Sequence, residues 1–131
     1  MTYIKAVFPY HLTSFTFKTD LDLSKGEFVI ANIKGTVRIG TVVDTDVPAE
    51  EQAMDLMSKV DVNYKKTLES FTYVAVKFNT SSKDYTYKTD LDLSVGEQVV
   101  VYANGRFEVV EVSKLDLDPP EFKTKVIVSR V

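Results

Sequence analysis

The sequence of 131 residues contains no cysteine and only one histidine, His11. Without cysteine the chain can form no disulfide, no thiolate nucleophile and no cysteine-ligated zinc site, and this composition fits a reducing compartment. A single imidazole with no second histidine cannot build a standard zinc site. We therefore interpret His11, which follows Pro9 at the exit of a predicted strand, as a surface loop residue.

Long apolar runs and phosphate-binding loops are missing as well. No run approaches the roughly 20 apolar residues of a membrane helix, and the N-terminus lacks the features of a secretory signal. The five glycines are scattered at predicted turns rather than gathered in a phosphate loop. The net charge is −3, without a basic half or stripe, which argues against nonspecific nucleic-acid binding. These absences predict a cytoplasmic protein with no cofactor and no membrane partner.

The main positive feature is an internal duplication. Tyr3–Val43 aligns with Tyr73–Ser113 at a constant offset of 70 residues without a gap, and 15 of the 41 aligned positions are identical. The blocks Thr16–Glu27 and Thr86–Glu97 share ten of their twelve residues. Composition alone does not produce such a match, so we infer two copies of one structural unit.

Each copy reads as a series of short strands, because apolar and polar residues alternate within it. Gly26 and Gly96 are expected at turns that need a positive φ. Lys34–Gly35 and Asn104–Gly105 lie between two apolar runs, a pattern typical of tight hairpin turns. The expected strands span residues 4–8, 15–19, 28–31 and 37–43 in the first copy, and residues 74–78, 85–89, 99–102 and 107–112 in the second.

After the shared part the copies diverge. Pro48 and the acidic residues behind it predict a short helix over residues 47–57, and Asn63 is a candidate cap for a second helical turn. Lys59–Val62 resembles Lys125–Val128, which predicts a fifth, closing strand in each copy. The predicted fold is therefore mainly β. It is a tandem duplication of a small five-stranded barrel, SH3-like or Tudor-like, with one or two short helices between the copies.

The predicted boundaries are residues 1–62 for the first barrel, 63–70 for a helical linker and 71–131 for the second barrel. Units this small bury a limited share of their surface, so we expect the two copies to pack against each other. The alternative is one larger sandwich built from both copies.

Two Asp-x-Asp pairs are the most tempting chemical motif. Asp20 and Asp22, like Asp90 and Asp92, could hold Mg²⁺ or divide acid and base roles. They lie between two predicted strands, where Asp side chains satisfy turn amides, and we expect Leu21 and Leu23 to point to the core. We therefore interpret the pairs as turn residues and predict no catalytic residue, no metal site and no enzyme activity.

Aromatic and basic side chains alternate on one strand of each copy, a pattern that can stack bases or grip a peptide. One ring of each pair is expected to fill the barrel and the other to cover an edge. Lys83 would extend such a surface in the second copy, whereas Asn32 and Thr36 replace two of its members in the first, so the copies are not expected to bind alike. The predicted binding residues are Tyr85, Tyr87, Lys88, Tyr102, Arg106, Phe17 and Lys18.

The Tyr85–Asp90 block resembles one found in small proteins encoded by phages and prophages of Gram-positive bacteria. The layout of an aromatic strand, Leu-x-x-Gly, a valine-rich strand, a Gly turn and a second valine-rich strand is more distantly similar to the N-terminal DNA-binding domain of the primosomal replication helicase. The first resemblance implies a phage accessory protein in a bacterial host cell, and the second implies DNA 3′-end binding. We predict a non-enzymatic macromolecule-binding module with a protein partner, and nucleic acid as the alternative.

Overall fold

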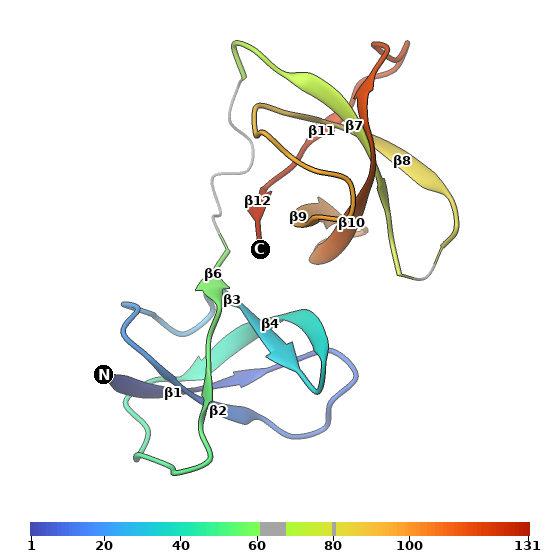
Figure 1. Ribbon diagram of the computed structural model, residues 1–131. Helices are drawn as coiled ribbons and strands as arrows, with labels where there is room; N and C mark the ends of the chain where they lie inside the picture. Colours follow the sequence, from blue (N-terminus) through green and yellow to red (C-terminus); the bar gives the residue numbers. More distant parts are fainter. Residues whose placement is uncertain (61–67, 80) are drawn as a thin grey trace. The chain divides into compact units, whose positions relative to one another are not determined.

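The chain consists of two compact β units, Met1–Val60 and Asp61–Val131. The computed structural model describes residues 1–60, 68–79 and 81–131, and no helix occurs among them. Each unit forms one six-stranded sheet that curls around its own core (Figure 1). The predicted duplication of a mainly β unit is confirmed at this level.

The strands have the same sequence order in both units. The first unit contains β1 (Thr2–Val7), β2 (Phe15–Thr19), β3 (Phe28–Ile33), β4 (Thr36–Asp44), β5 (Met54–Asp55) and β6 (Ser58–Lys59). The second unit contains β7 (Thr72–Lys77), β8 (Asp84–Thr89), β9 (Gln98–Ala103), β10 (Arg106–Leu117), β11 (Lys125–Val126) and β12 (Ser129–Arg130). The spatial order is β5-β2-β1-β4-β3-β6 in one sheet and β11-β8-β7-β10-β9-β12 in the other, so the topology is repeated.

One short segment covers both edges of each sheet. In the first unit, β5 pairs in parallel with β2, where Met54 faces Phe17, and β6 pairs antiparallel with β3, where Ser58 faces Ile30. The second unit repeats this pairing through β11 with β8 and β12 with β9. We call residues 54–59 and 125–130 the closing segments. Because each covers two edges that would otherwise be open, the unit presents no long edge for aggregation.

The register of the closing segments differs from the sequence-based alignment. Met54 lies opposite Phe17, and Lys125 lies opposite Tyr87, the counterpart of Phe17. The closing segments therefore correspond at an offset of 71, whereas the predicted match of Lys59 with Lys125 used 66 and is wrong by five residues. Two-residue strands carry too little periodicity to fix a register, and the similar Lys-Val-x-Val letters misled the alignment.

The short helix predicted over residues 47–57 is wrong. Only one turn forms there, with the Ala53 N–H donating to the Glu50 carbonyl at 3.1 Å, and the chain then runs extended through β5. Met54 and Leu56 pack against the core of the first unit while Asp55 between them is exposed. Packing at a period of two residues therefore overrode the helix-start signals of Pro and Glu. Most of the predicted helical linker, residues 63–67, lies outside the described residues.

Both predicted hairpin turns and both predicted glycine turns are confirmed. Lys34 and Asn104 have φ values of 53° and 55°, and the glycines that follow them have φ values of 89° and 79°. Two successive left-handed residues form the turn that suits the twist of paired strands. Gly26 has a φ value of 91°, as does its counterpart in the second copy.

The two cores fill the same space with different side chains. In the first unit the ring of Phe8 is buried, and a Cβ atom added at Gly40 would lie 2.6 Å from it. In the second unit the position of Gly40 is taken by Val110, which is buried, and Phe78 is only half-buried. A β-branched side chain on β10 thus occupies the space that a phenylalanine ring fills in the first copy.

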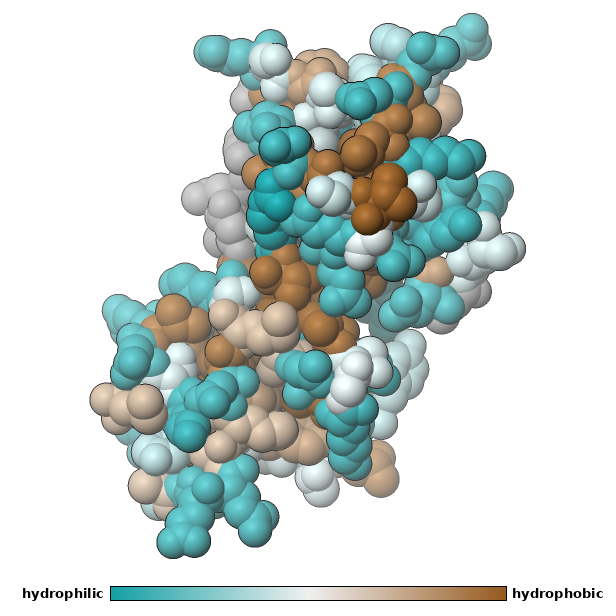
Figure 2. Space-filling model, viewed as in Figure 1, coloured by the Kyte–Doolittle hydropathy of each residue, from teal (hydrophilic) through white to brown (hydrophobic). Residues whose placement is uncertain are grey.

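Apolar side chains that remain outside the cores appear among mainly hydrophilic neighbours on the face drawn in Figure 2.

The close contact between Gly40 and the Phe8 ring gives a testable prediction. Gly40→Ala is expected to force the ring outward and to lower the free energy of unfolding by about 1–3 kcal/mol, as overpacking of a tight core does. Urea unfolding followed by circular dichroism measures the loss. The double variant Gly40→Ala with Phe8→Leu is expected to lose less than the sum of the two single losses, because the smaller side chain leaves room for the methyl group. Strict additivity would contradict this account.

Candidate functional site

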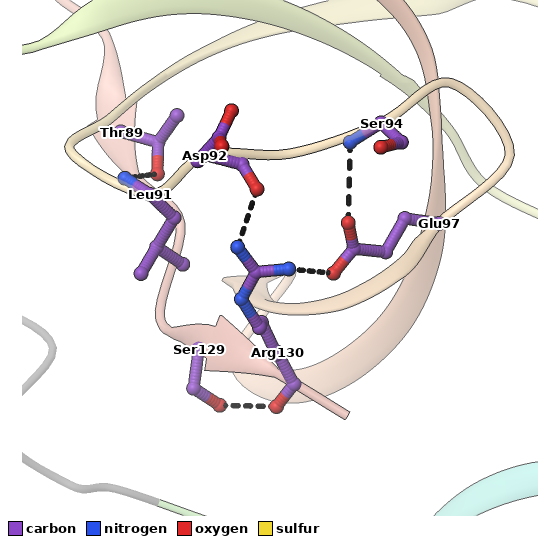
Figure 3. Close-up of polar contacts among 7 residues, drawn as sticks. All are labelled: Thr89, Leu91, Asp92, Ser94, Glu97, Ser129 and Arg130. Atoms are coloured by element: carbon purple, nitrogen blue, oxygen red, sulfur yellow. Dashed lines mark hydrogen bonds and ion pairs between the residues drawn. The ribbon is translucent and has the colours of Figure 1, made fainter.

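The duplicated block forms a turn between β8 and β9 that is held by its own side chains (Figure 3). The Leu91 N–H donates to the hydroxyl oxygen of Thr89 at 3.0 Å, and the Ser94 N–H donates to the carboxylate of Glu97 at 3.1 Å. Backbone bonds then tie the turn to β10, since the Gly96 N–H donates to the Val112 carbonyl at 2.8 Å. The five residues that make these bonds are identical in the two copies.

The first copy repeats these bonds position by position. The Leu21 N–H donates to the Thr19 hydroxyl oxygen at 3.0 Å, and the Ser24 N–H donates to the Glu27 carboxylate at 2.7 Å. The Gly26 N–H donates to the carbonyl of Val42 on β4 at 2.8 Å, as its counterpart does in the second copy. The two blocks follow the same backbone path, which supports a geometric role for their shared residues.

A basic residue of each closing segment binds the glutamate of this turn. Lys59 donates to the second carboxylate oxygen of Glu27 at 3.2 Å. Arg130 donates to Glu97 in the same way and also to the carbonyl of Asp92, as Figure 3 shows. We call this glutamate–cation pair the closing clamp. It ties the turn to the segment that covers both sheet edges, and the arginine version makes one bond more because guanidinium presents several donors.

The environment of Glu27 favours its ionised form. The hydrogen bond from the Ser24 backbone N–H and the bond from Lys59 together lower the pKa of the Glu27 carboxyl below its ordinary value of 4.5, although burial acts in the opposite direction. The carboxylate is therefore kept charged for a structural purpose. The pair is partly exposed, so its contribution is that of a screened surface ion pair.

The aspartates of the duplicated block do not take part in these carboxylate bonds. The residues Asp20, Asp22, Asp90 and Asp92 are exposed. Asp20 lies 3.7 Å from the amino group of Met1 in a shallow pocket of about 330 Å³. Within residues 1–60, 68–79 and 81–131, no group of three or more His, Cys, Asp and Glu side chains is placed to hold a metal ion.

The leucines between these aspartates only partly follow the expectation. Leu23 and its counterpart Leu93 pack against their cores. Leu91 packs against the second core as well, but Leu21 is exposed, so the prediction that it points to the core is wrong. The turn leaves the sheet here, and one of its alternate residues faces solvent.

A hollow in the second unit lies at the end of the barrel where β8 begins, and we call it the Tyr85 pocket. Its volume is about 680 Å³, within the range of ligand and peptide sites. Side chains from β8, from the turn after β9 and from the closing segment line it. The lining residues on which the argument depends are Tyr85, Phe78, Phe122, Lys83, Lys123 and Lys125.

Exposed aromatic rings stand in this pocket. Tyr85 is 42% exposed and Phe122 is 64% exposed, values that are high for side chains of this size. The ring of Phe78 meets that of Tyr85 edge to face at a centroid distance of 5.3 Å. The Tyr85 ring has a second contact, the ammonium group of Lys83, which lies 5.9 Å from the ring centroid. The pocket therefore combines an open apolar surface with positive charge.

The acidic groups of the pocket already have partners within the unit. Asp84 receives a hydrogen bond from Ser113 at 3.0 Å and lies 3.4 Å from the Lys114 ammonium. Burial opposes the charge of Asp84, but these bonds and the nearby cations outweigh it and lower its pKa below 3.8. Glu108 is paired with Arg106 at 3.0 Å. By contrast, Lys83, Lys123 and Lys125 form no ion pair with any side chain of the described ranges.

The structure brings three of the predicted binding residues together and separates the others. Tyr85, Tyr87 and Arg106 line the same pocket. Tyr87, however, is 6% exposed and belongs to the core, where burial, followed by the charge of Glu108, raises the pKa of its hydroxyl. Its ring fills the barrel while Tyr85 stays at the surface.

The remaining predicted residues lie on other faces. The Lys88 ammonium lies 5.3 Å from the centroid of the Phe71 ring, and Tyr102 packs edge to face on Phe107 at 5.0 Å. In the first unit, Phe17 is fully buried. Lys18 lies 3.8 Å from Asp55 of the closing segment.

Four of the named pocket members were not found from the sequence, and three of them come from the chain after β10. Phe122, Lys123 and Lys125 reach the site because the closing segment pairs in parallel with β8. This contact joins residues nearly forty positions apart, so no local sequence pattern predicts it. The one usable signal was Phe122 itself. It is a large aromatic residue in a charged stretch, where burial in a strand is not expected.

Comparison with protein-family models, with curated proteins and with solved structures found no significant match to this chain. No helix in the described part of the chain is long and apolar enough to cross a membrane. The function is therefore argued from the site itself.

The closing clamp gives a prediction about acid. Because the pKa of Glu27 is lowered in the folded state, the stability that its charge contributes is present above the ordinary pKa of 4.5 and is lost as the pH falls through the lower folded-state value. An NMR titration of the Glu27 carboxyl carbon is expected to give a midpoint below 4.5. Glu27→Gln is expected to flatten the acid limb of stability of the first unit. A midpoint at or above 4.5 would contradict the clamp.

Proposed function

We propose that this chain is a non-enzymatic binding module and that its Tyr85 pocket holds a segment of a partner protein. The observation that carries this proposal is the presence of two exposed aromatic rings, Tyr85 and Phe122, in one pocket of about 680 Å³. Aromatic side chains that line a recess and become desolvated on binding supply much of the energy of protein interfaces. The burial of both rings against a partner would remove a large apolar area from water.

The chemistry of the pocket suggests the kind of segment. The rings favour an apolar side chain at its centre, and Lys83, Lys123 and Lys125 around it favour acidic neighbours. Asp84 and Glu108 do not cancel these charges, because each already binds a cation of its own unit. We infer that the partner segment carries an apolar residue flanked by Asp or Glu.

The strand order also supports a finer description of each unit. Five successive strand regions, with the fifth divided between two edges, fit a small SH3-like or Tudor-like barrel, a fold that often binds extended peptides at its rim. The resemblance of the Tyr85–Asp90 block to phage and prophage proteins suggests an accessory protein in the cytoplasm of a bacterial host. A protein partner is consistent with the net charge of −3.

Nucleic acid is the second candidate, favoured by the lysines that stand beside exposed rings. Two observations weigh against it. Tyr87 is buried and Lys88 lies on a different face, so the expected stacking surface is split. The second unit, Asp61–Val131, carries 10 basic and 11 acidic residues, without the positive excess that grips a phosphate backbone.

The protein-binding proposal can be tested by peptide selection from a displayed random library. The full chain is expected to enrich sequences with an apolar residue between acidic ones. The double variant Tyr85→Ser with Phe122→Ser is expected to weaken binding of a selected synthetic peptide by about tenfold or more, as the loss of aromatic anchors does. Val95→Ala, at an exposed apolar residue outside the pocket, is the matched control and should change the affinity little.

A salt titration with single-stranded and 3′-ended DNA separates the two candidates. We expect the chain to bind DNA weakly, and we expect the double variant Lys123→Ala with Lys125→Ala to bind it equally weakly. Micromolar binding that falls steeply with salt and is lost in that variant would reverse the order of the proposals. Failure of the selection to enrich any sequence would count against a protein segment.

A further inference from the structure

Arg38 is a charged residue on the inner side of the first unit. In the pairing of β3 with β4 it lies opposite Ala31, and Gly40 lies opposite Val29. Ala31 and Val29 belong to the core, and directly opposed residues share one face of a sheet, so Arg38 projects to the core side. The side chain as a whole is half-buried, which leaves part of it accessible to a ligand.

The guanidinium of Arg38 has no acidic partner among the residues that the structure describes. Its Nε atom is buried and has no hydrogen-bond partner. No carboxylate of residues 1–60, 68–79 or 81–131 lies within 4.0 Å of it. A buried donor of a charged group that makes no bond carries a desolvation penalty that no interaction offsets. Such an arrangement is uncommon in folded proteins and calls for a functional explanation.

The second unit shows how the same position is normally satisfied. The counterpart of Arg38 is Glu108, which lies opposite Val101 and also faces the core side. Arg106 binds its carboxylate through both Nε and Nη2, each at 3.0 Å. The first unit has Thr36 in place of Arg106, two residues before Arg38 on the same face of β4. The charge at this position is therefore inverted between the copies. Among the described residues, the charge of Glu108 is neutralised by Arg106, whereas Arg38 has no such carboxylate partner.

An aromatic ring stands beside the guanidinium. Tyr10 is 78% exposed, and its ring centroid lies 5.8 Å from the Arg38 Cζ atom. The backbone of Tyr10 has a φ of 69°, a left-handed conformation that is costly for a bulky residue. Folding therefore holds this ring over Arg38 although the ring gains little burial. Strain of this kind is found where a side chain must be presented in a fixed place.

We propose that this end of the first unit binds a single carboxylate group, with Arg38 as its charged ligand and Tyr10 as its aromatic wall. Guanidinium matches the two oxygens of a carboxylate, and the bond gains strength in a partly desolvated site. One cation suits one anion, whereas a phosphate backbone needs several. The first unit, with 6 basic and 8 acidic residues in Met1–Val60, repels a polyanion.

The carboxylate could be the C-terminus of a peptide or an Asp or Glu side chain, and the two sources share the same chemistry. This site uses residues of the first unit only, whereas the Tyr85 pocket lies in the second. The two proposals can therefore fail separately, and variants in one site leave the other unchanged.

The test uses the arginine side-chain NMR signals of the full chain, which has only three arginines, Arg38, Arg106 and Arg130. Titration with sodium acetate is expected to shift the Arg38 Nε–H signal and the Tyr10 ring signals along a saturable curve. Arg38→Gln should abolish the saturable response at Tyr10, and Arg106→Gln is the matched control that should keep it. Sodium chloride at equal ionic strength should give no saturable shift.

Three outcomes would overturn the proposal. They are an unsaturable acetate response, an equal response to chloride, and tighter binding of inorganic phosphate than of acetate. Two model compounds then identify the source of the group. They are N-acetylalanine, which carries a terminal carboxylate, and N-acetylglutamate amide, which carries a side-chain carboxylate. If one compound binds more tightly than the other, the site is supported and the tighter compound identifies the source. If neither compound binds, the proposal is contradicted.

A second variant places the missing partner inside the protein. Thr36→Glu puts a carboxylate two residues from Arg38, in the geometry that Arg106 and Glu108 have in the second unit. This variant is expected to lose the acetate response and to raise the thermal midpoint of the first unit by about 2–4 °C relative to Thr36→Gln. Thr36→Gln adds the same length without charge and should keep the response. An acetate response that survives in Thr36→Glu would contradict a vacant carboxylate site.

Discussion

Each unit depends on a short segment that binds two strands at once. Residues 54–59 pair first with β2 and then with β3, which are the two open edges of a four-stranded sheet. A segment with only two paired residues at each edge would be weakly held by its backbone bonds alone. The clamp between Lys59 and Glu27 ties it to the turn between those strands, and Leu56 packs against the core beneath. Closure of the barrel, burial of the core and shape of the turn thus form one cooperative arrangement.

The two units share the same strand framework but differ in the side chains at the rim of the barrel. The turn residues are nearly identical in the two copies, and five of the identical positions, those of Thr89, Leu91, Ser94, Gly96 and Glu97, make the hydrogen bonds that shape the turn. The rim is free of that requirement and has diverged in charge, with Arg38 where the second copy has Glu108. It has also diverged in aromatic content, with Phe122 contributed by the approach to the second closing segment. Geometry is preserved where hydrogen bonds are local, and chemistry varies where side chains face solvent.

Much of the fold could be predicted from the sequence, since strands such as Phe15–Thr19 carry their period-two pattern within a few residues and Asn104–Gly105 specifies its own turn. The duplication gave a second, independent sequence that predicts each strand at the matching position. The closing segments could not be placed, because their position depends on pairing with strands far along the chain and on the packing of Leu56. The candidate site was only half visible for the same reason. Tyr85 stands on a predictable strand, whereas the lysines at 123 and 125 arrive through a long-range parallel contact.

The exchange at positions 40 and 110 reaches beyond the core. Val110 on β10 takes the position where Gly40 lies against the ring of Phe8 in the first unit, and Phe78, the counterpart of Phe8, is only half-buried against the core and contacts the ring of Tyr85. The wall of the pocket is thereby set from behind, by a residue that no ligand touches. A repeated gene segment could alter what each copy recognises through such hidden positions while every surface residue stays the same. In a tandem protein, interior volume is then as much a source of binding diversity as the surface itself.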